Sequence, residues 1–260
     1  MSQGRAGGSN ATGGSNRRIG VPVFLDTGVK FDELTHARAA EIIARYPMSR
    51  SALLPLLHLV QSVEGCVSQR GIEFCAAQLG LTEAEVSAVA TFYTMYKRTP
   101  CGEHLVSVCT NALCAALGGD AIYATLSRRL GVGHEQTAGE PGTPGSITLE
   151  HAECLAACDH APVLTVNYEY YDNQTPDSAL DLLTALQRGD KPHPTRGAPL
   201  TDFRANELEI AGIFTDLEQT VEAPTASEPT LRGSVLAERT GQRAPVMPDV
   251  VEFPPLPEKK

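Results

Sequence analysis

Two close pairs of cysteines constrain this chain more than any other feature of its sequence. Cys109 and Cys114 are separated by four residues, and Cys154 and Cys158 by three. Each pair lies beside a segment that reads as a strand, so both pairs are expected where a sheet passes into loops. A fold that brings them together presents four thiolates, which are the ligands that a [2Fe–2S] cluster needs, two for each iron.

Small residues surround these cysteines. A [2Fe–2S] cluster with four thiolates carries net negative charge, which is costly to remove from water unless hydrogen-bond donors surround it. Backbone N–H groups in tight loops supply such donors, and small residues let the backbone approach closely. The small residues beside the sulfurs are Ala112, Ala115, Ala116, Gly118, Gly119, Ala156 and Ala157. The surroundings therefore suit a buried anionic centre.

Other uses of four cysteines fit less well. Structural zinc sites favour two residues between paired ligands, whereas four and three intervene here. Disulfides are disfavoured because the cysteine count is odd, at seven, and nothing marks the chain as secreted. A dithiol oxidoreductase needs Cys-x-x-Cys, which is absent. A Rieske centre would use two histidines, and the segment from Cys158 to His160 resembles only half of one.

Composition excludes several classes of protein. The net charge of −10 argues against binding to nucleic acid or to anionic lipid headgroups. No apolar run approaches the roughly 20 residues needed to span a bilayer. The N-terminus lacks the apolar core of a signal peptide. We therefore expect a soluble cytoplasmic protein without direct membrane insertion, which reaches a membrane only through protein partners.

The N-terminal part predicts an arm and a helical bundle. Residues 1–16 are rich in Gly, Ser and Asn and are expected to be disordered, and residues 20–28 form a short apolar arm. Helical patterning then predicts four helices, over residues 33–46, from Ser49 or Ser51 to 64, over 72–79 and from the Thr82 capping box to 92. The three remaining cysteines, Cys66, Cys75 and Cys101, are interpreted as buried structural residues.

Within this bundle, side chains are expected to divide between core and surface. Leu53, Leu56, Leu57 and Val60 recur at helical spacing and are predicted to fill the core. Three aromatic residues at the end of the fourth helix, Phe92, Tyr93 and Tyr96, are predicted to face outward and to contact a partner.

From residue 104 the pattern changes to strands. Strands are predicted over 104–109, 147–151 and 162–168, with helices over 119–130 and from Asp177 to about residue 188. A hairpin is expected to extend the third strand through residues 169–172. The order of strand, helix, strand, strand and helix is that of a small thioredoxin-like α/β sandwich.

Residues 190–260 contain ten of the eighteen prolines and few periodic apolar positions. A short helix over 206–219 is possible. A disordered tail and an extended segment that orders on a larger complex both fit the composition. The apolar residues that favour docking are Phe203, Ile210, Ile213, Phe214 and Phe253.

Three histidines lie near the cysteine loops. His104, His151 and His160 could each donate a hydrogen bond toward a sulfur and tune a redox potential. Satisfaction of each ring by backbone or water is the simpler interpretation.

At these residues the chain resembles the thioredoxin-like [2Fe–2S] component, known as the E subunit, of bacterial NADH:quinone oxidoreductase, which is respiratory complex I. The resemblance spans about residues 31–189. The matching features are Cys-Thr-x-x-x-Cys at Cys109–Cys114, Cys-Leu-x-x-Cys at Cys154–Cys158, Ala161-Pro162 just after, and Ala90-Thr91-Phe92-Tyr93 before them. Either cysteine pair alone is a weak signal, but the two spacings followed by Ala-Pro are specific.

The resemblance implies an α+β fold class. A small four-helix bundle, residues 31–100, would precede a thioredoxin-like α/β [2Fe–2S] ferredoxin domain, residues 101–189. An extended N-terminal arm, residues 1–30, and a proline-rich extended C-terminal tail, residues 190–260, would flank them. Cys109, Cys114, Cys154 and Cys158 would hold one [2Fe–2S] cluster, with Cys109 and Cys114 on one iron and the other two on the second.

The resemblance also implies a function and partners. The chain would exchange single electrons with FMN on an adjacent FMN- and NADH-binding subunit, the F type of the family, near a further peripheral-arm iron–sulfur subunit, the G type. The assembled oxidoreductase would couple electron transfer to quinone with proton translocation, peripherally on the inner face of the cell membrane. The isolated chain has no G-x-G-x-x-G motif and is expected neither to bind nor to oxidise NADH.

Two alternatives remain open from the sequence. An equivalent component of an NAD-linked hydrogenase or formate dehydrogenase would show the same motifs. A non-catalytic assembly module with zinc, or no metal, in the cysteine site would differ in colour, because a [2Fe–2S] protein is red-brown.

Overall fold

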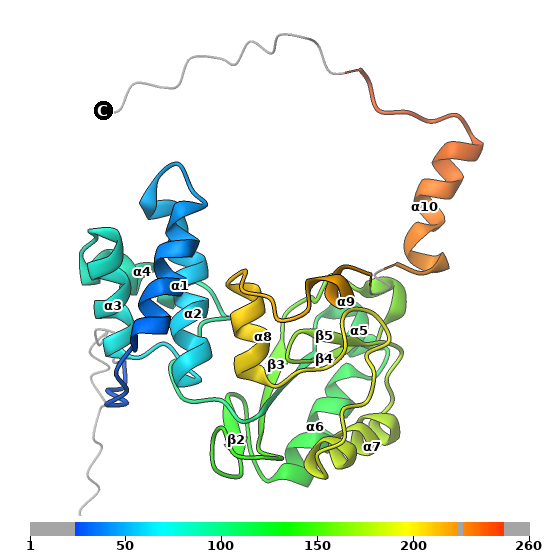
Figure 1. Cartoon of the computed structure of the whole chain (residues 1–260). Coiled ribbons are helices and arrows are strands. Elements are labelled where there is room, and N and C mark those ends of the chain that lie inside the picture. The colour runs from blue at the N-terminus through cyan, green and yellow to red at the C-terminus, as the bar shows by residue number, and fades with distance from the viewer. Residues whose placement is uncertain (1–23, 223–225, 247–260) are drawn as a thin grey trace, which may run out of the picture. The chain divides into compact units, whose positions relative to one another are not determined.

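The computed structural model describes residues 24–222 and 226–246 (Figure 1). The chain packs into two compact units that are not consecutive in sequence. Unit 1 comprises Met1–His104, Thr137–Thr148 and Thr201–Thr215, and unit 2 comprises Leu105–Gln136, Leu149–Leu200 and Asp216–Lys260. The domain limits suggested by the sequence stay a prediction, and the expected disorder of residues 1–16 lies outside the described residues.

Unit 1 begins with the four predicted helices, drawn in blue to cyan in Figure 1. They are α1 (Glu33–Ala44), α2 (Leu53–Glu64, entered through the 3-10 turn η1, Ser49–Ala52), α3 (Gln69–Leu79) and α4 (Glu83–Phe92). Asp32 caps α1 by accepting a hydrogen bond from the Thr35 N–H, and Thr82 and Glu85 form the capping box of α4. Gly65 ends α2 with φ of 78°, a conformation that glycine adopts without steric cost.

The core of unit 1 lies between these helices. Leu53, Leu56, Leu57 and Val60 are buried, as the helical spacing of α2 predicts. Burying one such side chain contributes about 1.5–3 kcal/mol. Phe31 packs against this core, with its ring tilted on that of Phe74 and the ring centroids 4.5 Å apart.

The three aromatic residues after α4 do not all face outward. Phe92 and Tyr93 are 78% and 45% exposed, but Tyr96 is only 6% exposed and donates a hydrogen bond from its hydroxyl to the Leu54 carbonyl. Helix α4 ends at Phe92, and the backbone of Tyr93 is extended, which turns the following chain inward. The prediction of an outward Tyr96 is therefore wrong, and this residue belongs to the core.

A helix from the predicted tail returns to unit 1. Helix α8 (Phe203–Ile210) is capped by Asp202 and packs on α2. Phe203 is fully buried, and His58 Nδ1 on α2 lies 2.6 Å from Glu207 Oε2 on α8. This part of residues 190–260 is thus folded, because one face of a short helix carries an aromatic anchor and a buried ionisable pair.

A five-stranded sheet carries the cysteine loops. Its strands are β1 (His104–Cys109), β2 (Gln136–Ala138), β3 (Ile147–Ala152), β4 (Leu164–Val166) and β5 (Glu169–Tyr171), in the order β2-β3-β1-β4-β5. Strand β1 is buried along its whole length and pairs antiparallel with β4, with Ser107 opposite Thr165. Strands β4 and β5 form the expected hairpin, and positive φ at Asn167 and Tyr168 makes its tight turn.

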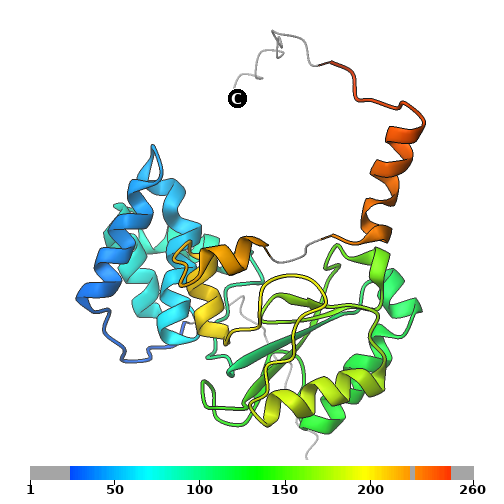
Figure 2. The same cartoon turned by 45° about the vertical axis from the view of Figure 1, so that its right-hand side comes forward.

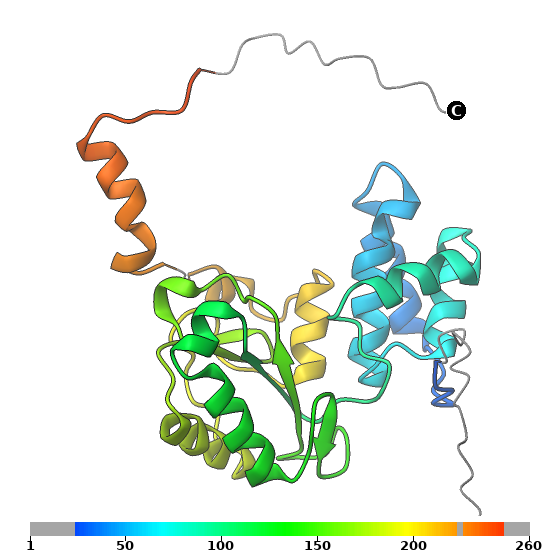
Figure 3. The same cartoon turned by 180° about the vertical axis from the view of Figure 1, so that it is seen from behind.

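Two long helices of unit 2 lie together on one side of these strands (Figure 2). Helices α6 (Gly119–Leu130) and α7 (Pro176–Gln187) contact each other and bury Ile122, Leu126, Leu182, Leu183 and Leu186. The view from behind shows the short helix α5 (Ala112–Ala116) leading into α6 (Figure 3). The thioredoxin-like order of strands and helices is confirmed.

The remaining elements of unit 2 are short or peripheral. They are the 3-10 turn η2 (Cys158–His160) and helices α9 (Leu217–Glu222) and α10 (Glu228–Arg239). Among the helices of the described residues, none has the length and apolar composition that crossing a bilayer requires.

Candidate metal centre

The first cysteine pair is buried at the end of the central strand. Cys109 is the last residue of β1, and Cys114 lies in α5; both side chains are about 1% exposed. The Cys109 N–H donates to the Val163 carbonyl, which fixes the strand end. The Asn111 side chain caps α5 by accepting from the Ala112 N–H. This pair is therefore held by the sheet and by a capped helical turn.

A glycine allows the first cysteine loop to be this compact. A Cβ on Gly119 would lie 2.4 Å from the Cys109 carbonyl oxygen and 3.0 Å from the Cys114 carbonyl carbon. Real Cβ atoms do not approach backbone this closely, so any side chain would displace one of the two cysteines. Gly119 is required by steric contact at the start of α6.

The second cysteine pair is exposed and already closely spaced. Cys154 Sγ and Cys158 Sγ are 3.6 Å apart, much longer than a disulfide bond of about 2.0 Å. Two sulfurs on one tetrahedral metal, with metal–sulfur bonds of about 2.3 Å, would be separated by about 3.8 Å. The observed spacing therefore suits two ligands of a single iron.

The backbone between Cys154 and Cys158 turns toward sulfur. The Ala156 N–H donates to Cys154 Sγ over 3.4 Å. Ala156 has φ of 57°, in the left-handed region that residues other than glycine rarely adopt. A backbone N–H aimed at a thiolate stabilises its negative charge, as expected of a loop that holds an anionic centre.

The first cysteine pair lies in an apolar cluster that also includes Ala157, from the loop between Cys154 and Cys158. Cys109, Cys114, Ala157 and Val163 pack together in it, with Leu155, Ala161 and Tyr170 partly buried around them. The peptide bond between Ala161 and Pro162 at this point is cis. The Thr110 N–H and hydroxyl both donate to the Ala152 carbonyl, and the Asn111 amide donates to Glu153, so three bonds join the first loop to the end of β3.

The thiols oppose one another's ionisation. Burial raises the pKa of Cys114 to about 11; a backbone hydrogen bond from Val163 opposes this rise, and the neighbouring Cys109 adds to it. The hydrogen bond from Cys154, then its charge, raise the pKa of Cys158, with a smaller effect from Cys109. Thiols so close together need cations to become thiolates, and metal binding releases their protons.

The thiol donors come as two pairs, one from the end of β1 and α5 and one from the segment that follows β3. Within residues 24–222 and 226–246, no three His, Cys, Asp or Glu side chains are grouped as a one-metal site requires. A [2Fe–2S] cluster asks for two thiolates on each iron, which two separate pairs can provide.

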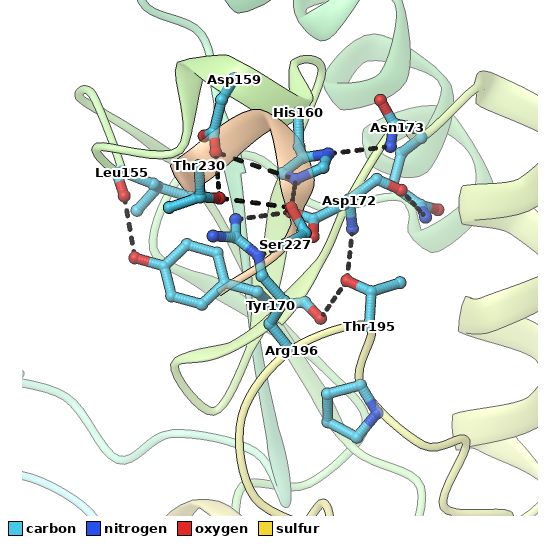
Figure 4. Close-up of polar contacts among 12 residues, drawn as sticks. Leu155, Asp159, His160, Tyr170, Asp172, Asn173, Thr195, Arg196, Ser227 and Thr230 are labelled. Carbon is cyan, nitrogen blue, oxygen red and sulfur yellow. Dashed lines mark hydrogen bonds and ion pairs between the residues drawn. The ribbon is translucent and has the colours of Figure 1, made fainter. Parts of the chain in front are cut away.

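An aromatic residue supports the second cysteine loop from the hairpin side (Figure 4). Tyr170 on β5 donates its hydroxyl hydrogen to the Leu155 carbonyl, 2.8 Å away. The Arg196 guanidinium lies 4.8 Å from the centre of the Tyr170 ring and makes a bidentate ion pair with Asp172, at 2.7 and 2.8 Å. Burial is the main cause that raises the pKa of Tyr170, so its hydroxyl stays a donor.

The residues after Cys158 have partners on two sides (Figure 4). Thr230 Oγ1 donates to Asp159 Oδ2, and this bond is the main cause that lowers the pKa of Asp159. Ser227 Oγ lies 2.5 Å from His160 Nε2, and the Asn173 amide lies 3.4 Å from His160 Nδ1. The Asn173 N–H also donates to the His160 carbonyl.

The histidines near the loops contact groups other than sulfur. His160 bonds to Ser227 and Asn173, His151 stacks on His134 with centroids 4.1 Å apart, and buried His104 has Nε2 3.6 Å from Glu103. These contacts of the rings are to other side chains, rather than to the backbone or water that the simpler interpretation supposed. Cys66, Cys75 and Cys101 are buried as expected, and burial raises the pKa of Cys66 to about 12.

Sequence reasoning missed the supporting residues of the site. Tyr170, Ser227 and Thr230 each lie at least 15 residues from their partners in the second loop, and Arg196 contacts the Tyr170 ring rather than the loop. One signal was available for α10: Ser227 precedes Pro229 and apolar residues at helical spacing, which is typical of a helix start.

Comparison with known proteins agrees with this geometry. The family described as "Thioredoxin-like [2Fe-2S] ferredoxin" matches residues 39–187. The E subunit of the NADH-quinone oxidoreductase of Mycobacterium tuberculosis H37Rv is 52% identical over 214 residues, 82% of this chain and 83% of the relative. The mitochondrial "NADH dehydrogenase [ubiquinone] flavoprotein 2" of Dictyostelium discoideum is 34% identical over 184 residues, 70% of this chain and 72% of the relative.

A solved structure also shows a likeness. The crystal structure of an NAD+-reducing [NiFe]-hydrogenase in the air-oxidised state superposes with a TM-score of 0.45 and 16% identity, over 52% of this chain and 23% of that chain.

Proposed function

We propose an electron-transfer function from the premise that this chain belongs to the thioredoxin-like [2Fe–2S] ferredoxin family and to the E subunits of NADH-quinone oxidoreductase. A member of this family carries one [2Fe–2S] cluster. The cluster ligands are Cys109, Cys114, Cys154 and Cys158. The observation that carries the assignment is the 3.6 Å between the Cys154 and Cys158 sulfurs, in a loop whose Ala157 packs with Cys109 and Cys114.

The residues of this chain have distinct roles in the proposed centre. Cys109 and Cys114 hold the inner side, where β1 and α5 bury them. Cys154 and Cys158 hold the outer side, where they are exposed. When bound, a [2Fe–2S] cluster with four thiolates exchanges one electron at a time, at a potential near −400 mV for plant-type sites. Because Cys154 and Cys158 are exposed, a partner that covers them would come within a short electron-transfer distance of the centre.

The surface around the first loop suits a protein partner. Leu113 and Leu117 flank Cys114 on α5 and are 45% and 56% exposed. Apolar side chains beside a redox centre exclude water when a partner covers them. We assign the surface that Leu113 and Leu117 form to contact with the FMN- and NADH-binding subunit, the F type. An iron–sulfur subunit of the G type would lie in a more distant part of the same complex.

The wider role follows from the family. The chain works in the NADH-oxidising part of a complex that passes electrons to quinone, and it reaches the inner face of the cell membrane through its partner proteins. The hydride of NADH is taken by the flavin-bearing partner, since this chain carries no dinucleotide-binding motif. The 52% identity to an E subunit of NADH-quinone oxidoreductase favours this complex over an NAD-linked hydrogenase or formate dehydrogenase.

Two measurements test the proposal. The chain, purified without oxygen, is expected to be red-brown, to contain about two irons and two sulfides, and to bleach on reduction. A colourless protein that binds zinc would refute the cluster. The chain co-expressed with its flavin-bearing partner is expected to give a reduced-cluster paramagnetic signal after NADH is added, and the isolated chain is not. A signal from the isolated chain with NADH would refute the division of roles.

A further inference from the structure

Helix α10 contacts the second cysteine loop through hydroxyl groups alone. No residue of α10 is buried, so apolar packing does not fix the helix in place. Its N-terminal end nevertheless meets η2, where Thr230 Oγ1 donates to Asp159 and Ser227 Oγ lies 2.5 Å from His160 Nε2. Asp159 and His160 directly follow Cys158.

Ser227 does not perform the ordinary task of its position. It stands at the N-cap of α10, where serine normally accepts a hydrogen bond from a backbone N–H of the first turn. Asp32, Thr82 and Asp202 all cap their helices in this way. Ser227 makes no such bond and directs its hydroxyl to His160 and Thr230 instead. The Ser227 hydroxyl therefore bonds to the second cysteine loop instead of capping α10.

His160 is held from both sides. The α10 side contributes Ser227, and the hairpin side contributes Asn173, whose amide lies 3.4 Å from His160 Nδ1. The N-terminus of α10 carries partial positive charge and faces the Asp159 carboxylate, which favours the contact electrostatically. The segment after Cys158 is therefore clamped between two elements of unit 2.

The α10 side of this clamp lies outside the part of the chain that matches the family. The family match ends at residue 187, whereas Ser227 and Thr230 lie about forty residues beyond it. The contact therefore adds a support that the shared domain does not itself contain.

We propose that Ser227 and Thr230 are positioning residues that fix the loop from Cys154 to His160 and so retain the cluster and set its potential. This inference rests on the proposed function, because it assumes the four cysteine ligands. The hydroxyls act through Asp159 and His160 and touch no sulfur. Releasing them would let the exposed pair move and admit water to the outer side of the centre.

The test uses the full chain and three variants. S227A/T230V removes both hydroxyls, and S227T/T230S keeps both in conservative form. Thr240→Val removes a hydroxyl from the other end of the same helix, where Thr240 Oγ1 bonds only to α10 carbonyls of Leu236 and Ala237. Because α10 has no buried residue, none of these changes disturbs a core, and melting curves verify this.

The first readout is release of iron to a chelator, together with the midpoint potential and reduced-state paramagnetic spectrum. S227A/T230V is expected to lose iron about three- to tenfold faster, the range for one or two lost hydrogen bonds, with a shifted potential and altered spectrum. S227T/T230S and Thr240→Val are expected to match the wild type. Equal release rates and potentials in S227A/T230V and the wild type would overturn the proposal.

A second readout does not depend on the cluster. In the metal-free chain, backbone amides of residues 154–160 are expected to exchange hydrogen about three- to tenfold faster in S227A/T230V than in the wild type. Equal amide exchange rates in S227A/T230V and the wild type would show that Ser227 and Thr230 do not hold the loop in place. A wild-type chain that never contains iron would refute the proposed function. A wild-type chain that contains the cluster, together with an S227A/T230V variant that behaves like it, would refute only this inference.

Discussion

His58 Nδ1 lies 2.6 Å from Glu207 Oε2 in the interior of unit 1. The two residues are 149 positions apart, one on α2 and one on α8, and both side chains are buried. Glu207 Oε1 has no hydrogen-bond partner among the described residues. A buried ionisable pair with an unsatisfied oxygen gives weak net stabilisation. Removal of one partner, however, leaves the other side chain buried without a hydrogen-bond or charge partner.

Replacing Glu207 by Ala is therefore expected to destabilise unit 1 by about 3–5 kcal/mol. The double variant His58→Leu/Glu207→Leu is expected to recover most of that loss, because neither side chain then needs a partner. Denaturant unfolding of both proteins measures the difference. A single variant as stable as the wild type would show that the pair does not hold α8 on α2.

Serine in place of any one of Cys109, Cys114, Cys154 or Cys158 is expected to abolish or strongly perturb the cluster. The matched control is Cys75→Ser, since Cys75 is fully buried in the core of unit 1, whereas the four cysteines belong to unit 2. Iron and sulfide analysis with reduced-state paramagnetic resonance measures both. A normal spectrum from Cys154→Ser, or iron lost from a folded Cys75→Ser, would contradict the ligand assignment.

Alanine at Gly119 is expected to displace the first cysteine loop, since the added Cβ would lie 2.4 Å from the Cys109 carbonyl oxygen. We expect a loss of about 1–3 kcal/mol, the range for overpacking in a close-packed interior, and reduced iron content. Gly233→Ala is the control, because nothing lies within 4 Å of its Cβ position on α10. That change is expected to be neutral or to stabilise the helix. Equal stability and iron content in Gly119→Ala and the wild type would contradict the steric argument.

Tyr93→Ala is expected to weaken binding to the flavin-bearing partner tenfold or more, because a buried aromatic at an interface centre often contributes about 2 kcal/mol. The 45% exposure of Tyr93 and its edge contact with Phe92 suit such a role. Tyr96→Ala serves as the contrast and is expected to lower the melting temperature of the free chain. A destabilised Tyr93 variant with unchanged affinity per folded molecule would reassign Tyr93 to the core.

Acid is expected to weaken the start of α4. Hydrogen bonds from Thr82 and Arg50, the Thr82 backbone first, lower the pKa of Glu85 from 4.5 to about 2. The folded pKa is depressed, so the stabilisation is present above pH 4.5 and is lost as pH falls toward 2. Melting curves of wild type and Glu85→Gln over this range check the prediction. Their difference should shrink on acidification, and a constant difference would contradict it.

Local patterns explain why much of the fold could be predicted. The caps at Asp32 and Thr82, the strand that ends at Cys109 and the paired cysteine spacing are all encoded within a few residues. Tyr96 could not be placed, because its direction depends on one extended backbone at Tyr93 that no periodic pattern specifies.

The features that could not be predicted from the sequence depend on contacts between residues that are far apart in the chain. The return of α8 to α2 depends on Arg204 and Glu207, which bond to residues of α2 that lie 140 or more positions earlier. The contacts of Tyr170 and Ser227 with the second cysteine loop likewise join residues whose proximity only the folded chain creates. Composition, which suggested a tail after residue 190, carries no information on such pairings.

The unequal burial of the four cysteines has a consequence for the life of the protein in the cell. Cys109 and Cys114 are sealed by the sheet, whereas Cys154 and Cys158 face solvent. In the proposed centre, oxidants and chelators would therefore reach the unassembled chain from this side, and damage would begin at the iron held by Cys154 and Cys158. A partner that covers this side would halt the damage, so newly made chains are most vulnerable in the interval before they join their complex.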